Sequence, residues 1–167
     1  SRRQRQMCIR DSFTFPHVGN VGTNHQDHES DKIWTKGIIL NTEITDPSNY
    51  RSLRHLDMWL KKNKIVGITG VDTRNLTNFI RDKGAPKGTI VFSKNKKFNI
   101  KELVKFTKRW SGLKNLDLAQ KVTTSKNYTW PGLKTWKKNK GYIINKKESF
   151  HVVAIDYGIK KNILRYF

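Results

Sequence analysis

The stretch Gly67–Phe92 constrains the fold of this chain most, because it alternates between the sequence patterns of strands and of a helix. A short apolar run at residues 65–68 overlaps its beginning and predicts a strand. Asp72 or Thr73 can then cap a helix, because a short side-chain oxygen accepts a hydrogen bond from the free N–H groups of the first turn. The β-branched and aromatic run Thr89–Phe92 predicts the next strand. The stretch therefore predicts a strand–helix–strand unit of an α/β protein.

The helix expected between these strands has an apolar face and a defined end. Leu76, Phe79 and Ile80 fall at positions i, i+3 and i+4, so one stripe of the helix is apolar. Gly84 suits the left-handed backbone that often follows a last turn. Pro86 cannot continue a helix, because it has no N–H and clashes with the preceding turn. The helix is therefore expected to end before the glycine.

Other segments predict further elements of both kinds. Apolar spacing at three and four residues predicts helices, and short β-branched or apolar runs predict strands. Lys, Asn and Gly residues between aromatic ones predict an exposed hairpin. The expected elements are strands at Ile33–Leu40 and Val152–Ile155, helices at Ser52–Asn63, Asn99–Trp110 and from Lys160 to Phe167, and a hairpin around Trp136–Ile144. Val152–Ile155 has the composition of a strand that is buried in a parallel sheet.

Composition excludes several classes of protein. With 167 residues, of which 35% are hydrophobic, the chain suits one domain, or one domain and a piece of another. No apolar run approaches the ~20 residues that a membrane helix needs, and the first residues show no apolar region of a signal peptide. The single cysteine, Cys8, cannot form an internal disulfide. We therefore expect neither a membrane partner nor an oxidising compartment.

The formal net charge of +21 raises nucleic acid as a partner. The lysines are spread from Lys32 to Lys161 and do not gather on one short arm, and asparagine is abundant as well, as in proteins encoded by AT-rich DNA. Lysines and aromatic residues alternate within 126–147, as they do in some single-strand binders. A basic nucleic-acid-binding module is therefore the alternative function and not the first interpretation.

Residues 1–12 differ from the rest of the chain. They show no periodicity and contain four arginines. The segment resembles translated adapter sequence of the kind found at the ends of sequencing reads, so we interpret it as non-native. The alternative is a basic arm that binds phosphate.

A group of possible metal ligands follows a glycine-containing loop. His25, Asp27, His28 and Glu29 are residue types that bind transition metals. The sequence contains no H-E-x-x-H motif and no pair of cysteines that would complete a known site. We expect a solvated loop here and no metal site.

Four separate blocks carry motifs of one known family. They are Pro16–Asn24, which has the sequence PHVGNVGTN, Val71–Gly88, Leu116–Thr124 and Phe150–Asn162. In this order and spacing, the blocks resemble the small subunit of glutamine-hydrolysing carbamoyl-phosphate synthase. The resemblance marks a set of family-signature residues that we expect to be structural or docking residues. They are His17, Gly19, Asn20, Gly22, Asn24, Asp72, Thr73, Arg74, Gly84, Asp156 and Gly158.

The resemblance implies an α/β fold in two parts. The first part would be the layered β/β/α N-terminal domain of the small subunit, which we place at residues 13–125. Residues 126–149 would form a basic connector. Residues 150–167 would be the start of a truncated class I glutamine amidotransferase domain.

The resemblance also implies a function for the complete subunit. It would hydrolyse glutamine and pass ammonia to the large subunit, whose ATP-dependent ligase reaction makes carbamoyl phosphate for arginine and pyrimidine biosynthesis in the cytoplasm. Its Cys nucleophile, His base and orienting Glu are expected beyond Phe167. This chain is therefore expected to dock on the large subunit and to be inactive alone. It would have no catalytic or glutamine-binding residue and no cofactor, since ATP and divalent metal are used by the large subunit.

A catalytic role of Cys8 is the one alternative to an inactive chain. His17 or His25 could in principle act as its base. No nucleophile-elbow motif, apolar strand or oxyanion loop surrounds the cysteine. We therefore predict no glutaminase activity from this residue.

Overall fold

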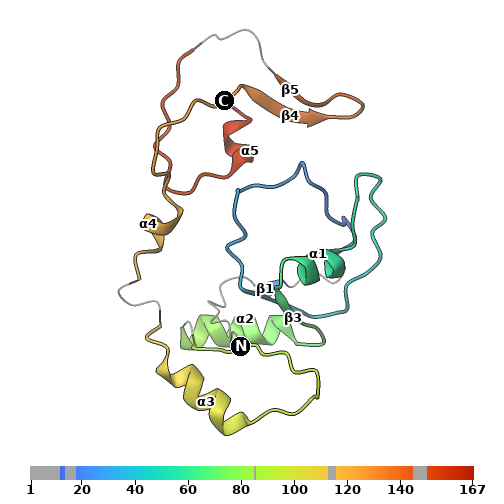
Figure 1. Ribbon diagram of the computed structural model, residues 1–167, viewed down its shortest axis with the longest axis vertical. Helices are drawn as coiled ribbons and strands as arrows, with labels where there is room; N and C mark the ends of the chain where they lie inside the picture. Colours follow the sequence, from blue (N-terminus) through green and yellow to red (C-terminus); the bar gives the residue numbers. More distant parts are fainter. Residues whose placement is uncertain (1–11, 14–17, 85, 113–115, 145–149) are drawn as a thin grey trace. The chain divides into compact units, whose positions relative to one another are not determined.

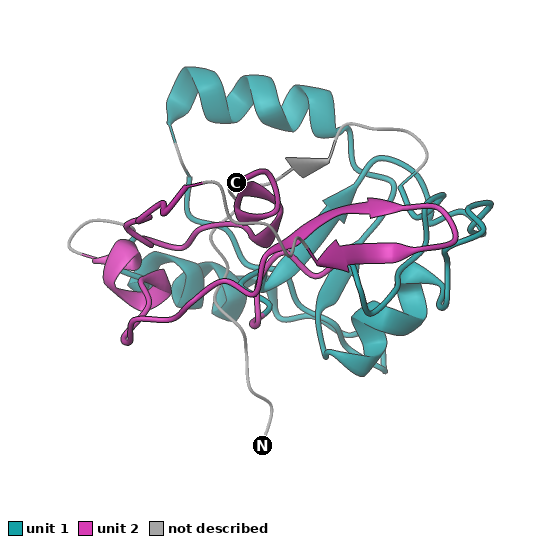
Figure 2. Cartoon of the chain, turned by 90° about the horizontal axis from the view of Figure 1, so that it is seen from above, with its two compact units in different colours: residues 1–27, 33–114 teal, residues 28–32, 115–167 magenta. Residues whose placement is uncertain are grey.

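The computed structural model describes residues 12–13, 18–84, 86–112, 116–144 and 150–167 (Figure 1). Within these ranges the protein is of the mixed α/β class with short sheets. The chain divides into two compact units, Ser1–Asp27 with Ile33–Lys114, and His28–Lys32 with Asn115–Phe167 (Figure 2). The layered arrangement and the domain limits at residues 125 and 149 remain predictions.

The first unit contains a three-stranded parallel sheet. Its strands lie in the order β1 (Ser12–Phe13), β2 (Gly37–Leu40) and β3 (Val66–Ile68). All four residues of β2 are buried, as expected for the middle strand of a parallel sheet. The strand predicted at Ile33–Leu40 is confirmed only in its last four residues, since residues 33–36 are exposed and irregular.

The hydrophobic core of the first unit lies between this sheet and helix α1 (Leu56–Lys62). Its buried members come from β2, from α1 and from the residue before β3. They are Ile38, Leu40, Leu60 and Ile65, with Val18, Ile44, Leu56 and Trp59 packed against them. Of the apolar spacing that predicts this helix, Leu56, Trp59 and Leu60 contribute to the core, whereas Leu53 lies before the helix and is 69% exposed.

Helix α1 is shorter than the helix predicted at Ser52–Asn63. It begins after His55, whose Nδ1 accepts a hydrogen bond from the backbone N–H of Asp57 at 3.2 Å. The helix starts late because Arg54 is paired with Thr23 in an antiparallel bridge, in which its carbonyl accepts the N–H of Thr23 at 2.9 Å and not a helical N–H.

Helix α2 (Thr73–Lys83) confirms the helix predicted in the central stretch. Gly84 follows its last turn with φ of +80°, in the left-handed region that glycine tolerates. Leu76 and Ile80 are half-buried, whereas Phe79 is 49% exposed. The predicted apolar stripe is thus only partly used within the described residues.

The strand predicted at Thr89–Phe92 is wrong. The segment forms no strand and lies instead beside helix α3 (Ile100–Arg109), where the hydroxyl groups of Thr89 and Thr107 are 2.7 Å apart. Its β-branched composition favours a strand only where another strand can pair with it. The helix predicted at Asn99–Trp110 is confirmed by α3.

The second unit contains an antiparallel hairpin and two short helices (Figure 1). Its elements are α4 (Leu118–Val122), β4 (Leu133–Lys137), β5 (Gly141–Ile144) and α5 (Lys161–Leu164). The predicted hairpin is confirmed. Helix α4 was not predicted, and α5 is one turn of the longer helix that the sequence favours. Across the described ranges, no helix combines the length and the apolar surface that a membrane crossing requires.

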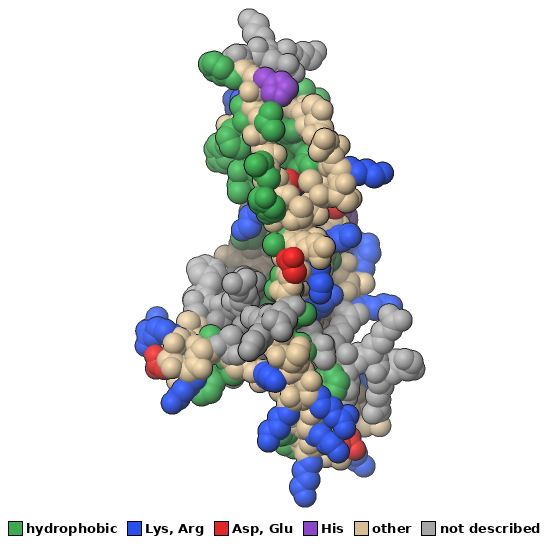
Figure 3. All heavy atoms as spheres, turned by 90° about the vertical axis from the view of Figure 1, so that its left-hand side faces the viewer, with side chains coloured by type: hydrophobic (Ala, Val, Ile, Leu, Met, Phe, Trp, Pro, Cys, Tyr) green, Lys and Arg blue, Asp and Glu red, His purple; other side chains and the backbone are tan. Residues whose placement is uncertain are grey.

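The buried strand predicted at Val152–Ile155 is also wrong. The segment is irregular, and Val153 and Ile155 are 81% and 77% exposed. Apolar side chains gather on the visible face of this unit (Figure 3). A strand needs a neighbour that satisfies its backbone N–H and C=O groups, and none of the described strands pairs with this run.

Candidate functional site

Residues 18–27 of the first unit form a loop that contains most of the first family-signature block, and we call it the signature loop. It turns where the backbone N–H of Gly22 donates to the carbonyl of Gly19 at 2.7 Å. Both glycines have positive φ, +100° at Gly19 and +67° at Gly22. A Cβ on Gly22 would lie 2.6 Å from Cβ of Ser52 and 2.9 Å from Cβ of Pro47. Neither the backbone conformation nor the space therefore allows a side chain at Gly22.

Backbone hydrogen bonds hold the signature loop against residues 48–54. Thr23 forms an antiparallel bridge with Arg54, in which the N–H of Thr23 donates at 2.9 Å and the N–H of Arg54 donates back at 3.1 Å. The carbonyl of Asn20 accepts from the N–H of Ser48 at 2.9 Å, and the Ser48 hydroxyl donates to Oδ1 of Asn20. These contacts satisfy the backbone of a loop that has no regular structure of its own.

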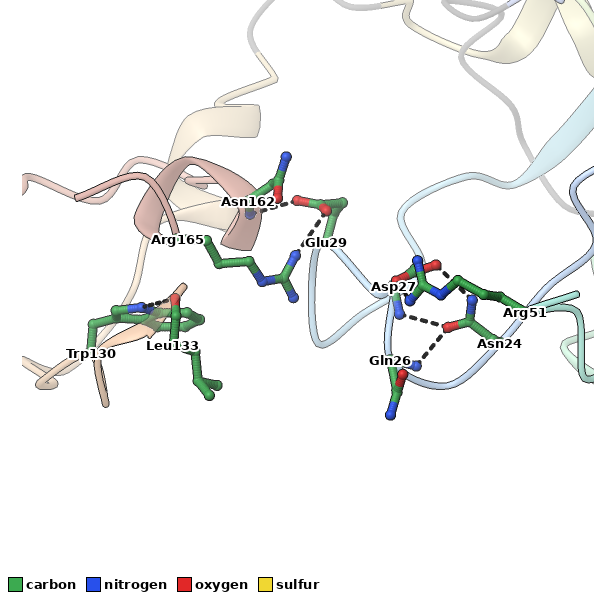
Figure 4. A network of polar contacts seen from close by, with 9 residues as sticks. All are labelled: Asn24, Gln26, Asp27, Glu29, Arg51, Trp130, Leu133, Asn162 and Arg165. Atoms are coloured by element: carbon green, nitrogen blue, oxygen red, sulfur yellow. Dashed lines mark hydrogen bonds and ion pairs between the residues drawn. The ribbon is translucent and has the colours of Figure 1, made fainter. Parts of the chain in front are cut away.

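Asn24 closes the end of the signature loop (Figure 4). Its Oδ1 accepts hydrogen bonds from the N–H groups of Gln26 at 2.8 Å and Asp27 at 2.9 Å, which is the local turn that asparagine favours. Its Nδ2 donates to one carboxylate oxygen of Asp27 at 2.6 Å, and the other oxygen pairs with Arg51 at 2.6 Å. The Arg51–Asp27 ion pair is partly exposed and stabilises the fold by at most about 1 kcal/mol. Its main effect is therefore to fix the position of the loop.

The second block of signature residues starts helix α2. Oδ1 of Asp72 accepts from the N–H of Asn75 at 2.9 Å, as predicted for a capping residue. Thr73 is 1% exposed, and its carbonyl accepts the hydroxyl of Thr77 at 2.7 Å. Asp72 and Thr73 therefore serve the helix, whereas Arg74 presents an exposed charge.

The fourth block, Phe150–Asn162, contains a turn in the second unit. The carboxylate of Asp156 accepts hydrogen bonds from the N–H groups of Ile159 at 2.8 Å and Gly158 at 2.7 Å, and from the hydroxyl of Tyr128 at 2.7 Å. The Ile159 bond first, and then the Tyr128 bond, hold the pKa of Asp156 below its ordinary value. The bond to Asp156 raises the pKa of Tyr128. Gly158 has φ of +102°, and a Cβ there would lie 2.7 Å from Cγ2 of Val122.

The substitution Tyr128→Phe is expected to raise the pKa of Asp156 without restoring its ordinary value, because the larger contribution of the Ile159 amide remains. Since the folded-state pKa of Asp156 is lowered, its stabilisation is present above about pH 4 and is lost as pH falls through the folded pKa. The raised pKa of Tyr128 acts in the opposite direction, with stabilisation that is lost above about pH 10. Carboxyl NMR titration measures the Asp156 shift.

The exposed Tyr157 provides the matched control for this titration. Tyr157→Phe should leave the pKa of Asp156 where it is. An equal shift in both variants, or none in Tyr128→Phe, would contradict the role assigned to the phenol.

The structure brings together some of the predicted signature residues and separates others. His17 lies outside the described residues. The rest occupy three places: the signature loop with Gly19, Asn20, Gly22 and Asn24, helix α2 and its end with Asp72, Thr73, Arg74 and Gly84, and the turn with Asp156 and Gly158. The predictions missed Ser48 and Arg51, which hold the loop. Residues 46–51 have the sequence DPSNYR, which is typical of a turn and was an available signal for them.

The possible metal ligands do not gather into one site within the described ranges, where no group of three or more His, Cys, Asp or Glu side chains could hold an ion. The carboxylate of Asp27 pairs with Arg51, and that of Glu29 pairs with Arg165. Cys8 lies outside the described residues, so the absence of a catalytic partner for it remains a prediction.

Comparison with known proteins gives one consistent family. The family model described as carbamoyl-phosphate synthase small chain, CPSase domain, matches residues 5–90. The carbamoyl phosphate synthase small chain of Bartonella henselae is 52% identical over an alignment of 160 residues, and the match covers 92% of this chain and 40% of that protein. The small chain of Bradyrhizobium diazoefficiens is 48% identical over an alignment of 158 residues, and the match again covers 92% of this chain and 40% of the relative. The chain thus spans about two fifths of the length of these relatives.

Proposed function

This chain belongs to the carbamoyl-phosphate synthase small-chain family, and on that premise we propose that it carries the docking part of a glutaminase subunit. The complete protein would release ammonia from glutamine in the cytoplasm. A large subunit would use this ammonia with bicarbonate, ATP and a divalent metal to form carbamoyl phosphate for arginine and pyrimidine synthesis. The observation that carries the proposal is the family match over residues 5–90.

We place the reacting groups of that enzyme outside these 167 residues. Hydrolysis through a covalent intermediate needs a thiolate, a base and a group that orients the base. The one cysteine, Cys8, belongs to the segment 1–12 that carries none of the four sequence blocks. The signature residues Asn20, Asn24 and Asp72 use their side chains on the chain's own groups, which supports a structural role. The chain itself would therefore bind no cofactor.

We expect the chain to co-purify with a large subunit from a related organism and to release no glutamate from glutamine, alone or in that complex. We assign docking to the N-terminal domain at residues 13–125, whereas the chemistry requires groups that we place elsewhere. Co-purification at micromolar concentration and a coupled glutamate assay, with and without the large subunit, measure the two parts separately.

The control for the assay is Cys8→Ser. This variant should change neither the binding to the large subunit nor the background signal of the glutamate assay. Turnover that the chain shows and the Cys8→Ser variant lacks would overturn the assignment of catalysis elsewhere. Absence of binding at micromolar concentration would overturn the docking part.

The basic face of α3 favours nucleic-acid binding as a second candidate. Lys101, Lys105, Lys108 and Arg109 lie together with Val104 on one exposed face of this helix. Lys and Arg side chains gather over this region, at the lower end of Figure 3. Such binding would weaken steeply as salt rises, because it releases counterions from the nucleic acid. A gel shift at two salt concentrations, compared with Lys105→Glu, separates this candidate from docking.

A further inference from the structure

Helix α5 begins without a capping side chain of its own. The residue at its N-cap position, Lys160, makes no side-chain hydrogen bond to the first turn. A lysine ammonium group has no acceptor to offer. Since the first N–H groups of a helix have no partner inside the helix, α5 depends on acceptors from another part of the chain.

Glu29 supplies these acceptors from a distant position in the sequence. Its backbone carbonyl accepts from the N–H of Lys161 at 3.1 Å. Its Oε2 accepts from the N–H of Asn162 at 2.8 Å, a contact between residues 133 positions apart (Figure 4). One residue therefore satisfies two of the free N–H groups of α5.

The other carboxylate oxygen of Glu29 reaches the far end of the same helix. Its Oε1 lies 3.3 Å from Nη1 of Arg165 (Figure 4). Arg165 is only 5% exposed, and its guanidinium carbon lies 4.1 Å from the centre of the Tyr142 ring in β5. Removing the carboxylate partner of a buried guanidinium strongly destabilises the folded state, because it leaves a buried charge unpaired. Glu29 thus contacts both ends of α5. Through Arg165 it also contributes to the contact between α5 and the hairpin.

A second ion pair in the same place contributes less. The ammonium group of Lys161 pairs with the carboxylate of Asp31, which is 86% exposed. Water screens such a pair and makes it worth little. Glu29 therefore contributes more to the contact between residues 28–32 and α5 than this exposed ion pair does.

We propose that Glu29 is a positioning residue, which caps helix α5 from residues 28–32 and holds the segment 160–165 in place. This role of Glu29 concerns the second unit and goes beyond the docking and glutaminase functions that are proposed above. It assigns a role to a carboxylate that the sequence pattern offered as a metal ligand. In a complete protein, Glu29 would connect the residues that follow the signature loop with the residues that follow the Asp156–Gly158 turn. This extension rests on the proposed function.

The test measures hydrogen exchange of the intact chain by mass spectrometry. In Glu29→Ala, amides in the peptide 160–167 should exchange about ten- to a hundred-fold faster, the factor expected for losing a hydrogen bond to a charged group. Amides of α2, in the first unit, should keep their rates. Glu43→Ala removes an exposed carboxylate of the first unit and should change neither peptide.

Two further variants keep the test decisive. Glu29→Gln retains an acceptor and should give an intermediate rate, and it replaces Glu29→Ala if that variant unfolds throughout. Adding Lys160→Asp to the Glu29 variant gives α5 its own capping side chain, at a residue whose extended backbone suits a cap, and should restore part of the protection. Unchanged exchange at 160–167 in a folded Glu29 variant, or no recovery with Lys160→Asp, would overturn the proposal.

Discussion

Leu40→Ala is expected to lower the free energy of unfolding of the first unit by about 3–5 kcal/mol. Leu40 ends the middle strand of the parallel sheet and is 1% exposed. It shares the buried cluster with Ile38, Leu60 and Ile65. Shortening the side chain removes these contacts and leaves a cavity. The cavity cannot close easily, because β2 is paired on both sides and α1 covers the cluster.

Leu53→Ala is the matched control for this substitution. It removes the same atoms from a leucine that is 69% exposed, and should change the free energy by less than about 0.5 kcal/mol. Urea unfolding followed by hydrogen exchange in the α1 peptide separates the first unit from the second. Equal losses in the two variants would show that Leu40 does not belong to the core.

The sequence predicted best those elements whose causes are local. Helix α2 has its cap at Asp72, its stripe at Leu76 and Ile80 and its end at Gly84, all within one short stretch. Helix α3 likewise has its cap at Asn99, whose Oδ1 accepts from a backbone N–H of the first turn. Such signals act between neighbours in the chain and do not depend on how the rest folds.

The strands were harder to predict, because a strand is defined by its partner. Thr89–Phe92 and Val152–Ile155 have the composition of strands, yet neither forms one in the described structure. Gly37–Leu40 has a similar apolar composition and does form one, with a neighbour on each side. Composition indicates a preference for burial or extension, and the pairing that decides the outcome lies elsewhere in the chain.

The residues of the candidate site also fall into those with local causes and those whose partners lie far along the chain. The need for glycine at Gly22 and the turn at Asn24 follow from motifs within nine residues, Pro16–Asn24. The contacts of Glu29 with α5 span more than 130 positions, and no local pattern in the sequence indicates them. The sequence thus located the signature loop and, in the turn at residues 46–51, held a signal for the segment that contacts it, but no local pattern indicated what the following residues contact.

Gly22→Ala is expected to cost the first unit about 2–5 kcal/mol, from two separate causes. The first is the backbone, because φ of +67° is unfavourable by about 1–2 kcal/mol for a residue with a Cβ. The second is overlap with Ser52 and Pro47, which typically adds about 1–3 kcal/mol when the surroundings must move. A movement of the loop away from Ser52 and Pro47 would strain its bridge between Thr23 and Arg54. Urea unfolding and exchange at residues 48–54 measure this loss.

Gly70→Ala separates the two causes. Gly70 has φ of +76°, close to that of Gly22, but a Cβ there would meet nothing within 4 Å. Its cost should therefore be the backbone part alone, about 1–2 kcal/mol, and exchange at residues 48–54 should stay unchanged. If the two variants lose the same free energy, the close approach of the signature loop to Ser52 contributes nothing. A larger loss at Gly22, with faster exchange at residues 48–54, means that glycine is needed because another segment occupies the space of its side chain.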